Sequence, residues 1–183
     1  MIISMILLVI LAIVAIWYVA TYNSFVRLRT ESQESWSQID VQLQRRNDLI
    51  PNLVSTVKGY SKYESETLAK VTGLRSAIMN AGSHQEAMDK SNQLTATLKS
   101  LFAVNENYPE LKANKQYQQL MEELANTENK IAYSRQLYNS VAASMNAKRQ
   151  SFPSNLVAKF QHFDAIEYLK APEAARTAPK VEF

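Results

Sequence analysis

Glycine and cysteine are the residues that this sequence lacks most clearly, with three glycines and no cysteine among 183 residues. A chain without cysteine forms no disulfide, binds no metal through thiolates and carries no thioether-linked lipid. Three scattered glycines build neither a phosphate-binding loop nor the Gly-x-Ser-x-Gly turn of many hydrolases. Several large enzyme classes are therefore excluded, and the abundance of helix-forming residues predicts an all-α protein.

Histidine and charge give no signal for catalysis or for nucleic-acid binding. The two histidines, His84 and His162, lie far apart, and neither belongs to a His-Glu-x-x-His or similar zinc spacing. We expect His84 at the surface and His162 in a packing position between two phenylalanines. The 20 basic and 17 acidic residues are interspersed, so no basic stripe suits a nucleic acid. We therefore predict no catalytic residue, no metal and no cofactor.

An uncharged apolar run occupies residues 2–20. As a helix it would be about 28 Å long, close to the roughly 30 Å hydrocarbon core of a bilayer, and Trp17 and Tyr18 near its end suit the headgroup layer. A cleaved signal peptide is the alternative, but no basic residue precedes the run and no Ala-x-Ala site follows it. We predict that residues 1–21 are a transmembrane anchor in contact with lipid.

Basic residues flank only one side of this span. Arg27 and Arg29 follow it closely, and Arg45 and Arg46 come later. Basic residues near a span tend to stay on the cytoplasmic side. The sequence therefore predicts a single-pass protein with its amino terminus outside and its larger part in the cytoplasm.

An apolar stripe leads directly out of the span. Trp36, Ile39, Leu43 and Ile50 share one helical face, and nothing between residues 20 and 47 breaks a helix. We expect the anchor and the first cytoplasmic helix to form one continuous rod. Pro51 either kinks this rod or begins the next helix, which we expect to cover about residues 52–80.

Capping signals divide the middle of the chain. Residues 83–86 match a capping box, in which Ser83 and Glu86 satisfy free N–H groups at a helix start, and this helix is expected to reach about residue 104. Residues 105–114 form the main predicted loop, where Pro109 pushes Tyr108 out of the helical region. Asn114 is expected to cap the next helix.

The longest periodic segment begins at residue 117. Apolar residues recur there every seven positions: Tyr117, Leu124, Ile131, Tyr138, Met145 and Phe152. The intervening stripe is mixed, which fits a helix of a bundle better than a strict two-stranded coiled coil, although a self-association seam stays open. This helix should stop near Pro153. One short helix or two should follow over residues 156–169, and then an extended tail over residues 172–183.

Two polar clusters are candidates for protein interaction. Arg45 and Arg46 precede Pro51, and Glu128 and Arg135 lie beside the apolar stripe of the long helix. Ordinary exposed pairs three or four residues apart explain such clusters in most helices. The alternative is a polar layer between helices that fixes their register or binds a partner. With Trp36, these four residues are the interaction candidates.

Several ordered motifs resemble those of the LemA family, from the anchor to the end of the chain. They are ESWSQIDVQLQRRNDLIPNLV at residues 34–54, LFAVNENYPELKAN at 101–114, TENKIA at 127–132, Arg135 with Tyr138 and Asn139, FPSNL at 152–156 and APKVEF at 178–183. The sequence departs from the family pattern in two places. Tyr63-Glu64 stands where many members have His-Glu, and Gln161-His162 replaces a step that commonly contains glycine.

The resemblance implies a bacterial membrane protein with one amino-terminal span and a cytoplasmic antiparallel helical bundle. It implies membrane and envelope functions, including a magnetosome-associated branch, and no established enzyme activity. We therefore expect an anchor at residues 1–21, a four-helix bundle with a short final helix at 22–171 and a tail at 172–183. The leading hypothesis is a non-enzymatic, homo-oligomeric scaffold at the bacterial inner membrane. An adaptor or sensor that binds an envelope protein or a small ligand is the alternative.

Overall fold

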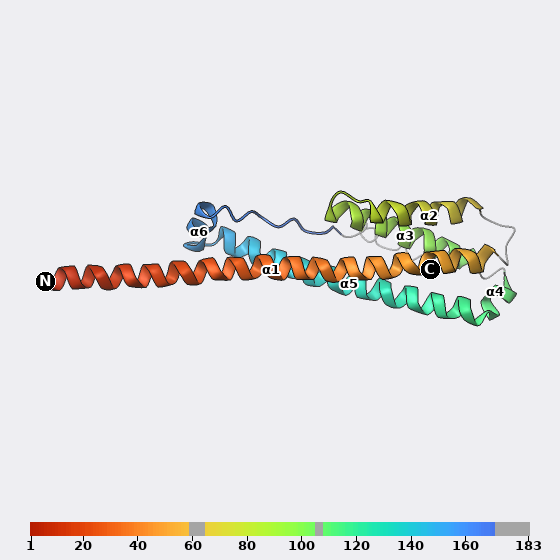
Figure 1. The fold of residues 1–183 in the computed structure, drawn as a ribbon, viewed down its shortest axis with the longest axis horizontal. Helices are drawn as coiled ribbons and strands as arrows, with labels where there is room; N and C mark the ends of the chain where they lie inside the picture. Colours follow the sequence, from red (N-terminus) through yellow and green to blue (C-terminus); the bar gives the residue numbers. More distant parts are fainter. Residues whose placement is uncertain (59–64, 105–107, 171–183) are drawn as a thin grey trace, which may run out of the picture. The chain divides into compact units, whose positions relative to one another are not determined.

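A computed structural model of the protein describes residues 1–58, 65–104 and 108–170. Within these residues all regular structure is helical (Figure 1), so the predicted all-α class is confirmed. The helices are α1 (Ile2–Lys58), α2 (Ser65–Met79), α3 (His84–Val104), α4 (Pro109–Ala113), α5 (Lys115–Gln150) and α6 (Ser154–Phe160). The Tyr63-Glu64 step, the first part of the predicted loop at residues 105–107 and the predicted tail lie outside the described residues.

Helix α1 begins with the predicted apolar run. Every large apolar side chain from Ile2 to Ile16 is more than half exposed. Exposed apolar surface of this extent is unfavourable in water and suits the hydrocarbon of a bilayer. Among the described residues, α1 is the helix that is long and apolar enough to cross a membrane. It continues without interruption to Lys58, so the predicted rod is confirmed.

The packing divides the described chain into two compact units. The first comprises residues 1–35 and 136–168, and the second comprises residues 36–135 with 169–170. The core of the first unit is aromatic. Phe25 of α1 is fully buried and stacks on Phe163 with 4.9 Å between the ring centroids. The other buried members of this cluster are Met145, Val157 and Ala158.

Side chains of α5 hold the segment that follows α6. The amide of Asn146 donates to the carbonyl of Ile166 at 2.8 Å and accepts from its N–H at 2.9 Å. Arg149 Nε donates to the carbonyl of Phe163 at 3.0 Å. These bonds supply the backbone partners that a neighbouring strand would otherwise provide. The sequence predicts one short helix or two over residues 156–169. The structure has one, α6, and the segment after it is held by these bonds.

Helix α6 ends at a left-handed residue that is not glycine. The Phe163 N–H donates to the carbonyl of Ala158 at 2.9 Å, which is the six-to-one bond of a Schellman turn, and His162 has a φ of 53°. This backbone region costs a residue with a β-carbon roughly 1–2 kcal/mol. The expectation that His162 packs between phenylalanines is wrong, because its side chain is exposed. The role of His162 in this turn is its left-handed backbone conformation and not the packing of its side chain.

Four helices supply the core of the second unit: α1 from residue 36, α2, α3 and the first part of α5. Figure 1 shows α2 and α3 side by side and running in opposite directions. The buried face of α1 in this unit includes Ile39, Leu43, Ile50, Leu53 and Val57. Buried side chains of the other helices include Val71, Met88, Leu94 and Leu124.

The seven-residue stripe of α5 is buried over most of its length. Tyr117, Leu124, Ile131, Tyr138 and Met145 are at most 5% exposed, which confirms the bundle-core interpretation for these positions. Burial also raises the pKa of Tyr117. The stripe fails at its last member, because Phe152 lies beyond the end of α5 and is 80% exposed.

The predicted caps are present in both places. The N–H of Glu86 donates to Ser83 Oγ at 3.1 Å, while the Glu86 carboxylate accepts from the N–H of Gly82 at 3.0 Å. Asn114 Oδ1 accepts from the N–H of Tyr117 at 3.0 Å at the start of α5. The predicted loop at 105–114 is wrong in its second half, where Pro109 begins the short helix α4. Its fixed φ suits a first helical position, and it holds Tyr108 outside the helical region as expected.

The expected start of a new helix near residue 52 is also wrong, because α1 passes through Pro51 and reaches Lys58, where the described residues break off until Ser65. A proline inside a helix has no N–H for the carbonyl four residues earlier, which here belongs to Asn47. Arg75 of α2 supplies the missing donor. Its Nε donates to the Asn47 carbonyl at 2.9 Å. A side chain from α2 thus completes the helical hydrogen bonding of α1.

This replacement bond predicts coupling between Arg75 and Pro51. Arg75→Ala should lower the free energy of unfolding by about 1–2 kcal/mol, since it leaves the Asn47 carbonyl without a donor. In a Pro51→Ala background the new N–H reaches that carbonyl, and the effect of Arg75→Ala should shrink by about 1 kcal/mol. Urea unfolding of the detergent-solubilised protein, followed by far-ultraviolet circular dichroism, measures both values. Equal losses in the two backgrounds would contradict this explanation.

Candidate functional site

A polar layer joins α1, α3 and α5 in the second unit. The side chain of Arg46 is 3% exposed, and its Nη1 lies 2.9 Å from Glu128 Oε2. The same guanidinium donates to the hydroxyls of Ser91 and Thr95 at 3.1 and 2.7 Å. Thr95 Oγ1 in turn lies 3.0 Å from Glu128 Oε2. These four residues are called the Arg46 layer below.

Burial makes the charge of Arg46 the central feature of this layer. Burial lowers the pKa of Arg46, and the Glu128 carboxylate opposes that shift. Arginine nevertheless stays protonated in proteins, so a full positive charge lies in the core and needs its partners there. For Arg46 and Glu128 the structure therefore contains the polar layer between helices rather than exposed pairing along one helix. Glu128 lies at the edge of the buried face of α5, next to Thr127, which is 1% exposed. From there its carboxylate reaches Arg46.

The other interaction candidates lie outside this layer. Arg45 Nη2 bonds Glu123 Oε2 at 2.5 Å, and both side chains are almost half exposed. Arg135 is half-buried on α5 and does not join the contacts of Arg46. Trp36 stacks on His84 with 3.7 Å between the centroids and an angle of 15° between the planes. His84 is exposed, as expected, and it also has this aromatic partner.

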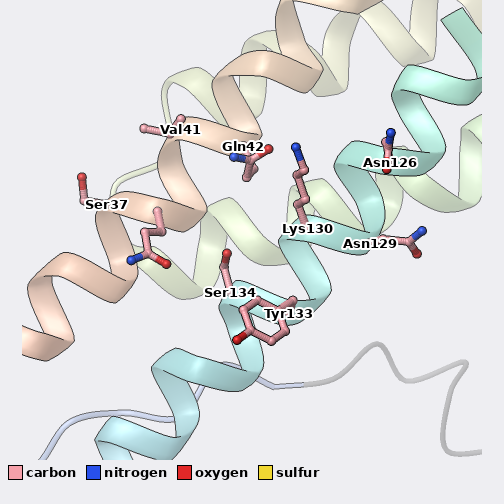
Figure 2. A pocket seen from close by; sticks show the side chains of 9 residues that line it. Ser37, Val41, Gln42, Asn126, Asn129, Lys130, Tyr133 and Ser134 are labelled. Carbon is pink, nitrogen blue, oxygen red and sulfur yellow. The ribbon is translucent and has the colours of Figure 1, made fainter. Parts of the chain in front are cut away.

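A groove of about 420 Å³ lies between α1 and α5 in the second unit. Figure 2 shows the side chains of Gln42 and Lys130 in the space between the two helices, with Tyr133 and Ser134 nearby. The remaining lining residues are Ser37, Gln38, Val41, Asn126 and Asn129. Val41 is 59% exposed and Tyr133 is 69% exposed. The groove therefore combines amides, hydroxyls, the ammonium group of Lys130 and two exposed side chains with nonpolar surface, Val41 and Tyr133.

Gln42 carries an unmet hydrogen-bonding requirement in this groove. Its Oε1 is buried and has no hydrogen-bond partner among the described residues. Leaving a buried acceptor without a donor costs about 1–3 kcal/mol. An amide in that state therefore favours the approach of an external donor at the α1–α5 groove.

Sequence reasoning identified Arg46 and Glu128 but missed Ser91, Thr95 and the groove. Ser91 and Thr95 are four residues apart on α3, close to buried positions such as Leu94. Two hydroxyl residues four positions apart lie on the same face of a helix, and apolar neighbours indicate that this face is buried. The pattern therefore predicts a polar contact inside the bundle. The groove has no such signal, because it depends on the separation between two helices that are distant in sequence.

The fold and its first helix define a class, namely helical bundle proteins with a segment suited to a membrane. The profile of the LemA family matches residues 35–183, and the chain belongs to the LemA family. It is 30% identical to Protein LemA of Metamycoplasma hominis, over 87% of this chain and 73% of that protein. The resemblance inferred from the motifs is therefore confirmed.

Two further relatives carry a different name. The chain is 25% identical to Magnetosome protein MamQ 2 of Paramagnetospirillum magneticum, over 93% of this chain and 74% of that protein. It is 24% identical to Magnetosome protein MamQ of Magnetospirillum gryphiswaldense, over 85% of this chain and 67% of that protein. The first of these matches covers a larger share of this chain than residues 35–183, which the family profile matches.

The Arg46 layer predicts unequal effects for two glutamates of α5. Glu128→Ala should lower the free energy of unfolding by about 2–3 kcal/mol, because it leaves a buried guanidinium without its counter-charge. The matched control Glu123→Ala breaks the exposed pair with Arg45 and should cost less than about 1 kcal/mol. Urea unfolding of both variants tests the difference. Equal losses in the two variants would show that the buried Arg46–Glu128 pair stabilises the fold no more than the exposed Arg45–Glu123 pair.

Proposed function

We propose that this LemA-family protein is a non-enzymatic, self-associating scaffold. Helix α1 anchors it in the bacterial inner membrane, with the amino terminus outside and the helical units at the cytoplasmic face. The observation that carries the proposal is the α1–α5 groove, where the buried Oε1 of Gln42 has no donor among the described residues. A second copy of the chain is the partner that we assign to this groove.

The groove contains groups that complement one another across a two-fold contact. Asn126 and Asn129 offer amide N–H donors, and Gln42 offers the unpartnered acceptor. In a two-fold contact each copy presents the same surface, so donors of one copy face the acceptor of the other. The exposed side chains of Val41 and Tyr133 add nonpolar area at the same place.

Membrane anchoring strengthens a contact of this kind. Molecules that share one membrane move in two dimensions with a common orientation, which raises their effective concentration. The apolar run itself has no Gly-x-x-x-Gly pattern for close helix contact. We therefore assign self-association to the groove rather than to the span.

The non-enzymatic part of the proposal follows from how the charged side chains are used. The Arg46 guanidinium is bound by Glu128 and by two hydroxyls, and Arg45 is paired with Glu123. Each pair links α1 to α5. These charged side chains are used in contacts between helices. This use supports a structural role for them rather than a catalytic one.

The proposed orientation rests on Arg27 and Arg29 and predicts the location of the carboxyl terminus. Green fluorescent protein exported in an unfolded state does not fluoresce, so a carboxy-terminal fusion should be bright if the units are cytoplasmic. An alkaline phosphatase fusion, which needs the oxidising exterior, should be inactive. Placing basic residues before Ile2 and changing Arg27 and Arg29 to Asn should reverse both signals. Phosphatase activity in the unmodified fusion would overturn the orientation.

Self-association should depend on the exposed groove residues. Val41→Glu combined with Tyr133→Glu introduces like charges where two copies would meet, and it should shift the protein in nanodiscs or detergent toward monomer. Both side chains are more than half exposed, so the fold should survive. Gln119→Glu, at an exposed position of α5 outside the groove, is the control and should leave the mass unchanged.

Mass photometry or light scattering over a wide concentration range measures this shift. If the unmodified full-length protein is monomeric throughout, the scaffold proposal fails. If it is oligomeric and the groove variant assembles equally well, self-association stands but the α1–α5 groove is not its surface.

A further inference from the structure

A second cavity, of about 360 Å³, lies in the second unit between α1, the end of α2 and the start of α3. Trp36, Asp40 and Asn47 line it from α1, while Gly82, Ser83 and His84 line it from the other side. Trp36 and His84 form the stacked pair described above, and both rings line the cavity.

Asn47 presents an unmet acceptor to this cavity. The residue is 1% exposed, and its Oδ1 has no hydrogen-bond partner among the described residues. Its backbone carbonyl is already engaged by Arg75, so the helix defect at Pro51 does not account for the side chain. A buried amide oxygen in this position requires a donor from outside the described residues.

The charges around the cavity are negative. Asp40 lines it, and the Glu86 carboxylate reaches its rim by accepting the N–H of Gly82. Neither lysine nor arginine is among the described residues that line it. Burial lowers the pKa of His84, against the opposing effect of Asp40, so the imidazole is largely neutral at pH 7 and does not repel a cation.

We propose that this cavity binds a cationic N–H donor, a guanidinium or a primary ammonium group. Asp40 supplies the counter-charge, the Oδ1 of Asn47 accepts a hydrogen bond, and the Trp36–His84 pair adds aromatic rings of the kind that cations favour. The site is independent of the α1–α5 groove, because the two share no lining residue. It adds recognition of a ligand to the proposed scaffold.

Two sources could supply this chemistry. One is a free or partner-borne amine. The other is the chain itself, whose residues 171–183 include Arg176 and Lys180. The N–H of Lys170, the last described residue, donates to Gln85 Oε1 at 3.2 Å, near the start of α3 that lines the cavity.

Agmatine, which carries both cationic groups, is a suitable probe. The full-length protein with Trp17→Phe, in nanodiscs of zwitterionic lipid, leaves Trp36 as the only tryptophan. We expect agmatine to change its emission in a saturable way, and calorimetric titration to give the same midpoint. The uncharged analogue butylurea should bind at least about fivefold more weakly, because it lacks the charge that Asp40 attracts.

Two variants test the assigned contacts. Asp40→Asn, at an exposed position, should weaken agmatine binding about fivefold or more without affecting the fold. Asn47→Ala should weaken it as well by removing the acceptor. The control Glu122→Gln removes one exposed carboxylate of α5 outside the cavity and should leave the affinity unchanged.

Deleting residues 171–183 separates the two sources. Binding to the full-length protein supports a free or partner-borne cation, whereas binding only after the deletion supports occupation by the chain itself. The proposal is overturned if neither form binds agmatine at millimolar concentrations, if butylurea binds equally well, or if Asp40→Asn has no effect. None of these results depends on oligomeric state, so failure here leaves the scaffold proposal to its own test.

Discussion

A buried guanidinium is the constraint on which the second unit depends. Apolar contacts have little directional preference, whereas the hydrogen bonds of Arg46 need their partners at fixed positions and so select one register of the helices. Arg46 reaches Glu128 on α5 and the two hydroxyls on α3, so it fixes three helices at once. The next residue, Asn47, accepts from Arg75 and so fixes the fourth helix, α2. Two consecutive residues of α1 thereby hold the other three core helices in place.

The two units solve the same backbone problem in related ways. In the second unit, a proline removes a donor from α1 and an arginine side chain replaces it. In the first unit, the segment after α6 lacks a neighbouring strand, and Asn146 and Arg149 of α5 supply its partners. In each case a long polar side chain completes the bonding of a distant backbone group. This chain therefore contains irregular backbone without leaving these particular groups unpaired.

Local sequence signals predicted those parts of the fold that depend on neighbours in the chain. The apolar run, the caps at Ser83 and Asn114 and the stripe from Tyr117 to Met145 are all of this kind. Pro51 was misjudged because its cost is local, whereas its compensation comes from Arg75 on another helix. For Arg46 and Glu128 the sequence allows both exposed pairing and a buried polar layer, because the spacing of charges does not reveal burial. The groove and the cavity could not be predicted, because their shapes depend on packing between distant segments.

The position of Asn47 links two features that are otherwise separate. Its carbonyl belongs to the one turn of α1 where proline leaves a backbone group without its helical donor, and its side chain lines a cavity with an acceptor to offer. A ligand bound to that side chain would also restrain the turn of this 57-residue helix that contains Pro51. Local opening of this turn, seen as amide hydrogen exchange around residues 47–55, would then slow as the cavity fills. If the cavity binds the proposed cation, exchange at the Pro51 turn would report its occupancy, on the same helix that carries the apolar segment suited to a membrane.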